Sequence, residues 1–178
     1  MAAEQASDPT RRNFIYVATG ALGALGAASI AWPLIDQMNP SADVLALSST
    51  KVSLKSVTQG QQITVLWRGH PVFVRHRTAK EIEAADATDI QTLRDPEPDD
   101  KRVVTFNGAL MKEWLVLVGV CTHLGCIPKA DSGGDSAWLC PCHGSHYDTS
   151  GRIRKGPAPK NLAVPPYKFT SPTEILIG

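Results

Sequence analysis

The side chains best suited to bind a metal are gathered in two short segments of the chain. All 4 cysteines and two of the 5 histidines lie within CTHLGC (residues 121–126) and CPCHGS (residues 140–145). The ligand spacing is Cys-x-His in the first segment and Cys-x-x-His in the second. Both segments lie at the ends of apolar, strand-like runs, so we expect them to form rigid loops that project from a sheet.

Two thiolates and two imidazoles on paired loops suit a [2Fe–2S] cluster in which cysteines bind one iron and histidines bind the other. A tetrahedral zinc uses the same ligand types, but Cys-x-His is a poor zinc-finger spacing and six potential ligands are two too many. Cys126 and Cys142 then remain as an equivalent pair, one in each loop. They could close a disulfide in an oxidising compartment.

The composition excludes several other functions. The chain has 178 residues, enough for one domain and a small additional segment, and it is 43% hydrophobic and 20% charged, as expected for a chain that folds around a core. Its 18 basic and 17 acidic residues give a net charge of +1, which argues against nucleic acid as the main partner. Walker A, GxGxxG and GxSxG motifs are absent from the sequence, so nucleotide binding and serine-hydrolase chemistry lack support.

The N-terminal region is predicted to be a membrane anchor. Residues 13–35 contain no Asp, Glu, Lys, Arg or His, and a helix of this length can cross a bilayer core of about 30 Å. Arg11 and Arg12 directly precede the run, which resembles a twin-arginine export signal. The run carries no Ala-x-Ala pattern, so we favour an uncleaved anchor over a cleavable signal peptide. Because the next basic residue is Lys51, the positive-inside rule places residues 1–12 in the cytoplasm and the rest of the chain outside.

Beyond the anchor, the sequence indicates a linker and a mostly β head. Residues 36–50 are polar, contain Pro40 and are predicted to be a hinge, in which residues 45–47 could form a marginal helix. Residues 51–178 form the head. Four strands are predicted in it, at residues 62–67, 71–74, 114–120 and 174–177. Arg68-Gly69 is expected to form the tight turn of a hairpin between the first two.

A short helical insertion is predicted in the middle of the head. The patterns Thr78-x-x-Glu81 and Thr88-x-x-Gln91 are capping boxes, which predict two short helices within residues 79–94. The sequence DPEPDD that follows, at residues 95–100, is expected to be an exposed acidic loop. Residues 107–110 look like a local insertion.

The two cysteine–histidine loops resemble those of the Rieske iron–sulfur family, specifically the disulfide-containing iron–sulfur subunit of ubiquinol–cytochrome c reductase, the cytochrome bc complex. The likeness covers the anchor, the hinge, VRHRT at residues 74–78, both loops and GPAP at residues 156–159. It implies a mainly β fold, with an N-terminal transmembrane helix and an antiparallel β-sandwich head. A cluster-binding subdomain, about residues 118–160, and the short helical insertion would be inserted in that head.

The resemblance also implies a role for each site residue. The residues that match the ligands of one [2Fe–2S] cluster are Cys121 and Cys140 for the inner iron and His123 and His143 for the outer, solvent-facing iron. Cys126 and Cys142 match the disulfide, and the hydroxyls of Ser145 and Tyr147 match donors of hydrogen bonds to cluster sulfurs. Such donors favour the reduced cluster, so we expect a potential in the upper part of the Rieske range, roughly −150 to +300 mV. The residues that match an apolar docking tip are Leu124, Gly125 and Pro157.

The implied function is electron transfer in a proton-translocating quinol:cytochrome c oxidoreductase. A quinol hydroxyl would bond to His143, the cluster would take one electron as the imidazole takes the proton, and movement of the head would carry the electron to a c-type cytochrome. The implied partners are a cytochrome b subunit and a c-type cytochrome subunit in a dimeric complex. The complex would lie in the bacterial cytoplasmic membrane, with the head in the periplasm.

Three alternatives carry different functions. The Rieske small subunit of an exported molybdenum oxidase, such as arsenite oxidase, shares the export signal and the cluster type. A ferredoxin or oxygenase Rieske domain usually lacks counterparts of Cys126 and Cys142 and has no membrane segment. A zinc or disulfide module would have no redox role.

The remaining histidines and tryptophans are predicted to be structural. His70 and His76 are expected to be ordinary strand-end residues. His146 lacks a partner at ligand spacing and is expected to be exposed or hydrogen-bonded. Trp67, Trp114 and Trp138 are expected to pack in the core rather than to carry electrons.

Overall fold

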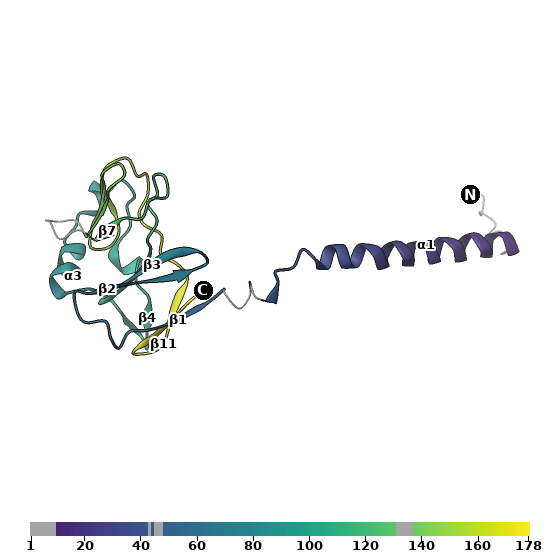
Figure 1. Cartoon of the computed structure of the whole chain (residues 1–178), viewed down its shortest axis with the longest axis horizontal. Coiled ribbons are helices and arrows are strands. Elements are labelled where there is room, and N and C mark those ends of the chain that lie inside the picture. Colours follow the sequence, from purple (N-terminus) through teal and green to yellow (C-terminus); the bar gives the residue numbers. More distant parts are fainter. Residues whose placement is uncertain (1–9, 43, 45–47, 131–136) are drawn as a thin grey trace, which may run out of the picture. The chain divides into compact units, whose positions relative to one another are not determined.

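The computed structural model describes residues 10–42, 44, 48–130 and 137–178. The chain divides into two compact units, Met1–Leu45 and Ala46–Gly178, which are considered separately below (Figure 1). Of the expected linker at 36–50, residue 43 and residues 45–47 lie outside the described residues, and so does the marginal helix expected at 45–47. The second unit is mainly β and antiparallel, in agreement with the predicted fold class.

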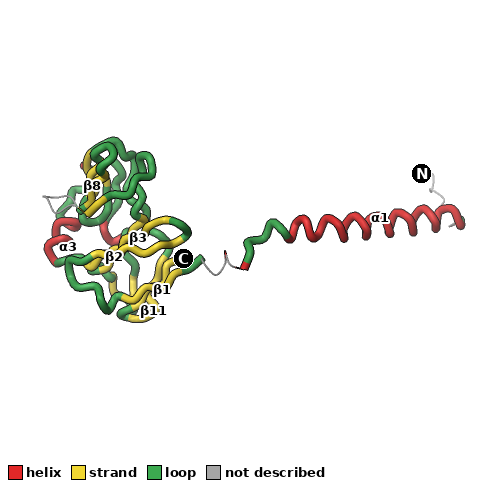
Figure 2. The backbone as a smooth tube through the Cα atoms, in the orientation of Figure 1, coloured by secondary structure: helices red, strands yellow, loops and turns green. Residues whose placement is uncertain are grey.

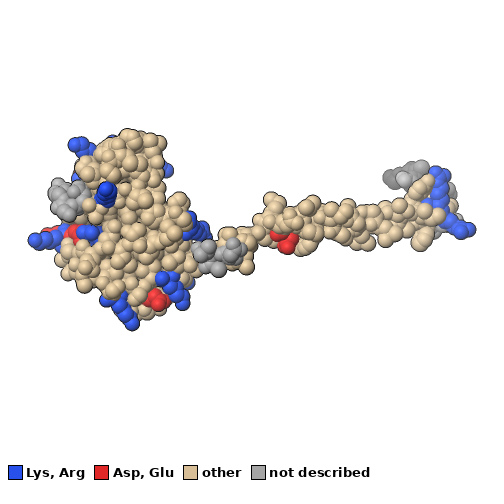
Figure 3. Space-filling model, viewed as in Figure 1, with Lys and Arg blue, Asp and Glu red and all other residues tan. Residues whose placement is uncertain are grey.

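The first unit contains one long helix, α1 (Arg11–Asp36, 26 residues), which includes the predicted anchor. Thr10 caps its N-terminus, where the side-chain oxygen accepts a hydrogen bond from the Asn13 N–H. Figure 3 shows basic side chains only at the N-terminal end of α1 and an acidic group only toward its C-terminal end. No residue of α1 is buried in the protein. By length and composition α1 can cross a membrane.

Two three-stranded antiparallel sheets form the base of the head. The first joins β1 (Thr50–Ser53), β12 (Glu174–Ile177) and β11 (Tyr167–Ser171) in that order. The second joins β2 (Gln62–Trp67), β3 (His70–His76) and β6 (Trp114–Val118). A hydrophobic core with contributions from both sheets, including Val52, Val74 and Ile175, packs them into a sandwich.

A four-stranded antiparallel sheet forms the upper part of the head. Its order is β10 (Ile153–Lys155), β9 (Ser145–Tyr147), β8 (Trp138–Cys140) and β7 (Lys129–Ala130). Figure 2 shows β8 and the loops around it at one end of the head and β1 and β11 at the other. A second hydrophobic core, which includes Trp138, Tyr147 and Ile153, lies in this part.

Strands β3 and β6 face both cores at once. Residues that contribute to the first core are Val72, Val74, Trp114 and Val116, and residues that contribute to the second are Phe73, Leu115 and Leu117. Because successive side chains of a strand point to opposite faces, burial on both faces requires an unbroken apolar run. This explains the sequence WLVLV, and it makes the central sheet the support of the upper subdomain.

Two tight hairpins carry the backbone conformation that their sequences require. Arg68 and Gly69, between β2 and β3, have φ values of 49° and 78°. Asn107 and Gly108, between β4 (Thr105–Phe106) and β5 (Ala109–Leu110), have φ values of 50° and 83°. Positive φ at both central residues is the condition for a type I′ turn, which matches the twist of paired strands. Residues 107–110, expected as an undefined insertion, therefore belong to a hairpin.

The helical insertion between β3 and β6 was predicted only in part. The capping box of Thr78 and Glu81 opens α3 (Ala79–Asp86), as expected. The second predicted box is wrong: the one-turn helix η1 (Ile90–Thr92) is capped by Asp89, not by Thr88. The Thr88 hydroxyl instead donates to the Ala84 carbonyl at 2.9 Å, so it is used to end α3.

The predicted exposed acidic loop at 95–100 is also wrong in one respect. It leads into the short helix η2 (Asp99–Lys101), and Asp99 is only 3% exposed. The carboxylate of Asp99 accepts two hydrogen bonds from the buried Arg77 guanidinium, at 2.7 and 2.9 Å. The burial cost of each charge is offset by the other, which a sequence pattern does not reveal.

One contact fixes where the head begins. The indole N–H of Trp67 donates to the carbonyl of Ser48 at 2.8 Å, two residues before β1. Trp67 is itself part of the first core. The backbone at Ser48 is therefore held by a side chain of the hairpin β2–β3.

Candidate metal centre

The two cysteine–histidine segments form loops of matching geometry, one after β6 and one between β8 and β9. In each loop a glycine with positive φ, Gly125 at 81° and Gly144 at 70°, turns the chain back. The Gly125 N–H donates to the Cys121 carbonyl at 2.9 Å, and the Gly144 N–H donates to the Cys140 carbonyl at 3.0 Å. Glycine suits both positions because other residues rarely adopt this conformation.

The loops bring the four expected ligand side chains together with the thiols inside. Cys121 and Cys140 are both buried, whereas His123 is half-buried and His143 is exposed. The two imidazole rings lie edge to face, with centroids 4.6 Å apart. The site therefore has a buried sulfur side and a nitrogen side that reaches the surface.

A disulfide between Cys126 and Cys142 joins the two loops. The sulfur of Cys140 lies within 4.8 Å of both sulfurs of this bridge, but two sulfurs of that trio are already bonded to each other. Cys121 and Cys140 are thus the thiols that remain for a metal. Burial raises the pKa of the Cys140 thiol. At Cys121 burial acts in the same direction, but hydrogen bonds from Tyr147 and from the His123 backbone outweigh it and lower the pKa of that thiol.

Tyr147 is a buried hydrogen-bond donor to this sulfur side. Its hydroxyl lies 3.2 Å from the sulfur of Cys121 and accepts from the Thr122 N–H at 3.3 Å. Because Thr122 occupies the acceptor side, the phenolic proton is available to the sulfur. Burial raises the pKa of Tyr147 to about 12, so the hydroxyl keeps its proton at physiological pH. Ser145, the second predicted donor, is fully buried and faces Cys140 across β8 and β9.

The segment 156–159 packs on the second loop. A Cβ at Gly156 would lie only 2.5 Å from the carbonyl oxygen of Gly144, so only glycine allows this approach. Of the residues expected in the docking tip, Leu124, Gly125 and Pro157 are all exposed. Ile127 is also exposed and was not predicted; an apolar residue one position after Cys126 was its only sequence signal.

A framework of buried charges holds these loops on the helical insertion, and the sequence reasoning missed it. Arg102 donates to the carbonyls of Ser150 and Leu162, at 2.6 and 2.5 Å. Arg152 pairs with Asp148 at 2.8 Å and donates to the Ala85 carbonyl of α3. The one sequence signal was the i, i+4 spacing of Asp148 and Arg152, which is not specific.

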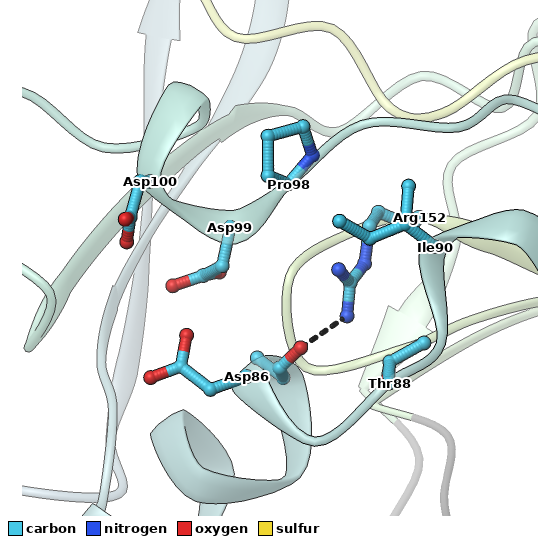
Figure 4. Close-up of a pocket in the computed structure, with 8 residues that line it drawn as sticks. Asp86, Thr88, Ile90, Pro98, Asp99, Asp100 and Arg152 are labelled. Atoms are coloured by element: carbon cyan, nitrogen blue, oxygen red, sulfur yellow. Dashed lines mark hydrogen bonds between the residues drawn. The ribbon is translucent and has the colours of Figure 1, made fainter.

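A second group of candidate ligands is already neutralised. A hollow of about 90 Å³, lined among others by Asp86, Asp99 and Asp100, lies beside α3 and η2 (Figure 4). Lys112 contacts Asp86 at 2.9 Å and Asp100 at 2.7 Å, and Asp99 is paired with Arg77. These carboxylates therefore serve internal ion pairs, and they do not form a cation site in the described part of the chain.

Two predictions about the remaining aromatic residues are confirmed, the strand-end positions of His70 and His76 and the burial of the three head tryptophans. His70 and His76 lie at the two ends of β3, and the ring of His76 stacks on Trp114 with centroids 4.1 Å apart. His146 lies within β9. The three head tryptophans are all buried: Trp67, Trp114 and Trp138.

The donor set fits a [2Fe–2S] cluster with mixed ligands. Two buried thiols can bind one iron, and two imidazoles near the surface can bind the other. Buried hydroxyl donors on the sulfur side suit a cluster whose sulfurs gain negative charge on reduction. A mainly β head with this arrangement of paired loops defines the class of Rieske-type iron–sulfur proteins.

Comparison with known proteins agrees with this class and refines it. Two family profiles match the chain, "Ubiquitinol-cytochrome C reductase Fe-S subunit TAT signal" at residues 1–41 and "Rieske [2Fe-2S] domain" at residues 49–167. The chain belongs to the family of ubiquinol–cytochrome c reductase iron–sulfur subunits. It is therefore a component of an oxidoreductase complex and carries a Rieske [2Fe–2S] domain, and its export signal and α1 fit a membrane-anchored subunit.

Individual relatives cover nearly the whole chain. The ubiquinol–cytochrome c reductase iron–sulfur subunit of Rhodospirillum rubrum is 57% identical over 176 residues, covering 96% of this chain and 93% of that protein. The subunit of Blastochloris viridis is 52% identical, covering 100% and 98%. A solved structure described as "Hyperthermophilic respiratory Complex III" has a TM-score of 0.54 at 26% identity, covering 90% of this chain and 98% of that one. The molybdenum-oxidase, ferredoxin and zinc-module alternatives are set aside on this ground.

Proposed function

We propose that Cys121 and Cys140 bind the inner iron, and His123 and His143 the outer iron, of one [2Fe–2S] cluster. The observation that carries this assignment is the pairing of two buried thiols with two imidazoles 4.6 Å apart near the surface, on loops joined by a disulfide. When bound there, such a cluster supplies one-electron oxidation and reduction.

His143 is the residue that meets quinol in this proposal. It is more exposed than His123, so a quinol hydroxyl can reach its ring and donate a hydrogen bond to it. The imidazole then takes the proton as quinol is oxidised. Leu124 and Gly125 lie in the same loop as His123, and Leu124, Gly125 and Pro157 are all exposed, so these residues form the docking tip in this proposal.

The partners follow from the same assignment. The head accepts one electron at a cytochrome b subunit and passes it to a c-type cytochrome subunit by moving about residues 36–50. The support for this movement is the division of the chain into two compact units near that segment. The complex is a dimer in the bacterial cytoplasmic membrane, with the N-terminus in the cytoplasm and the head in the periplasm. Twin-arginine export through Arg11 and Arg12 places it there.

A redox titration of the full-length protein in its membrane tests the cluster assignment. The cluster is followed by electron paramagnetic resonance at several pH values, with iron and labile sulfide counted. Two irons, a high potential and a potential that falls as the pH becomes alkaline are expected, because an imidazole that loses its proton stabilises the oxidised cluster. A low potential that does not change with pH would overturn the role of the histidines.

Head movement needs a separate test, because the cluster assignment can be correct even if the head does not move. Replacing residues 39–42 by four prolines stiffens the segment between the two units. The expected result is slower quinol:cytochrome c turnover with an unchanged potential. Replacement by Gly-Ser-Gly-Ser is the matched control and is expected to keep turnover. Equal turnover in both variants would contradict movement about this segment.

A further inference from the structure

Arg94 is an exposed residue of the helical insertion whose side chain reaches the segment 156–159. Its Nη1 atom lies 2.6 Å from the carbonyl oxygen of Gly156 and 2.7 Å from that of Ala158. This nitrogen carries two hydrogens, so one terminal amino group can donate to both carbonyls, which flank Pro157. The role described so far for the metal centre does not use Arg94.

The segment that Arg94 holds is in direct contact with Ser145. Because a Cβ at Gly156 would lie 2.6 Å from the Cα of Ser145, the two backbones touch. The N–H of the buried Ala158 donates to the Ser145 hydroxyl oxygen at 3.2 Å. A displacement of the segment 156–159 would therefore change the surroundings of the Ser145 hydroxyl.

The contact between the Ala158 N–H and Ser145 controls the direction in which the Ser145 hydroxyl proton points. A serine hydroxyl has one proton to donate and accepts on its other side. With the Ala158 N–H on the acceptor side, the proton of Ser145 is directed away from Ala158. Ser145 is paired directly with Cys140, one of the two thiols of the site, across β8 and β9. Without the Ala158 contact the hydroxyl is free to rotate to other acceptors.

We propose that Arg94 is a positioning residue for the metal centre. By holding the carbonyls of Gly156 and Ala158, it keeps the Ala158 N–H on Ser145 and so keeps the Ser145 proton available to the sulfur side of the site. This inference rests on the proposed cluster and on the role expected for Ser145, whose hydroxyl matches a donor of hydrogen bonds to cluster sulfurs. The insertion also holds the chain just after the segment, since Asp95 accepts from the Asn161 N–H at 2.9 Å.

A double-mutant cycle on the reduction potential tests the proposal in the membrane-bound, full-length protein. The variants are Arg94→Gln, Ser145→Ala and the double variant. Arg94→Gln is expected to lower the potential, Ser145→Ala to lower it by at least as much, and the double variant to equal Ser145→Ala alone. The control Lys155→Gln removes a positive charge beside Gly156 and is expected to shift the potential less than Arg94→Gln. Hydrogen exchange of the Ala158 amide is expected to be faster in Arg94→Gln.

Each other outcome overturns a defined part of the argument. An unchanged potential in Ser145→Ala removes the proposed role of Ser145, and with it this inference. A lowered potential in Ser145→Ala with an unchanged one in Arg94→Gln overturns the role of Arg94 alone. Additive shifts in the double variant, or an equal shift in Lys155→Gln, show that Arg94 acts through charge or solvent access and not through Ser145. An unchanged rate of hydrogen exchange at the Ala158 amide would show that Arg94 does not hold the segment 156–159 in place.

Discussion

At the scale of single residues, the head contains two buried tyrosines with opposite surroundings. Burial raises the pKa of both Tyr147 and Tyr167 to about 12, so both keep their protons. The Tyr147 hydroxyl contacts the Cys121 sulfur, whereas the Tyr167 hydroxyl has no hydrogen-bond partner among the described residues. The Tyr147 hydroxyl is thus placed next to the expected cluster ligands, whereas Tyr167 contributes to the packing of the first core.

Removing the Tyr147 hydroxyl tests its effect on the metal centre. Tyr147→Phe is expected to lower the reduction potential, because the donor stabilises the extra negative charge of the reduced state. A loss of about 1.4 kcal/mol corresponds to about 60 mV for one electron, and a shift on the order of 50 mV is expected. Tyr167→Phe is the matched control and is expected to leave the potential unchanged in the same redox titration. A shift of equal size in both variants would contradict the argument.

At the scale of elements, the helical insertion is joined to the residues that flank β3 and β6 by ion pairs of very different burial. Arg77 and Asp99 are fully buried, while the nearby pair of Lys112 and Asp100 is partly exposed. Buried pairs are costly to break because one charge remains without a partner, whereas exposed pairs contribute little. The buried pair of Arg77 and Asp99 therefore contributes most to holding the insertion in place.

Asp99→Ala is expected to lower the free energy of unfolding by about 3–5 kcal/mol, because it leaves the Arg77 guanidinium buried without an anion. Asp100→Ala, one position along the same element, is expected to cost about 0–1 kcal/mol. Denaturant unfolding of the full-length protein in detergent measures both. Similar losses in the two variants would show that the buried pair has no special weight.

The approach of the segment 156–159 to the second loop gives another test at this scale. Gly156→Ala adds a Cβ that clashes with the Gly144 backbone, while Gly69→Ala adds one in open space. Both residues have positive φ, so each variant incurs backbone strain of about 1–2 kcal/mol. The larger loss of stability is therefore expected for Gly156→Ala, in thermal unfolding. Equal losses would mean that the segment can move away from Gly144 freely.

The elements that follow local rules were predictable, and those that depend on distant partners were not. The capping box at Thr78 and the hairpin turn at Arg68-Gly69 are encoded within a few residues, and both were predicted from sequence. Thr88 has the same pattern as Thr78, but its hydroxyl is used by the preceding turn of α3. Asp99 looks like any acid in a loop, because its partner Arg77 lies 22 residues away along the chain.

The metal centre was accessible to sequence reasoning for a related reason. Its expected ligands occupy two short segments, and the ligand types themselves limit the chemistry. The residues that hold those loops are scattered: Arg94, Arg102 and Arg152 contact backbone carbonyls, which every residue carries. Any residue type can supply a backbone carbonyl, so the sequence does not indicate which residue accepts such a hydrogen bond. These contacts could therefore be identified only in the structure.

At the scale of the whole molecule, the paired carboxylates make the head sensitive to acid. Burial alone would raise the pKa values of Glu81 and Asp99. Hydrogen bonds from the Thr78 backbone and Arg75 outweigh it at Glu81, and the hydrogen bonds and charge of Arg77 outweigh it at Asp99, so both pKa values are lowered. A carboxyl whose folded pKa is lowered stabilises the fold above its unfolded pKa, and this stabilisation is lost as the pH falls through the folded value. The free energy of unfolding is therefore expected to decrease as the pH falls below the ordinary pKa values, which are 4.5 for Glu81 and 3.8 for Asp99.

Glu81→Gln tests this pH dependence without removing the helix cap, since glutamine can complete a capping box. The variant is expected to be less stable than the wild type at neutral pH and to lose less stability on acidification below pH 4.5. Glu83→Gln, exposed on the same helix, is the control and is expected to keep the wild-type slope. Unfolding free energies measured from pH 6 to pH 3 in about one-unit steps decide this. Parallel curves for wild type and Glu81→Gln would contradict it.

The hydrogen bond from Trp67 to Ser48 has a consequence for how the head meets its partners. About a dozen residues separate Ser48 from the end of α1 at Asp36, and covalent geometry limits that distance to about 40 Å. In the head movement proposed above, a tether of this length gives the head an effective concentration on the order of millimolar at sites within its own complex. Binding at each site can then be weak and brief, because the next encounter never depends on diffusion from solution.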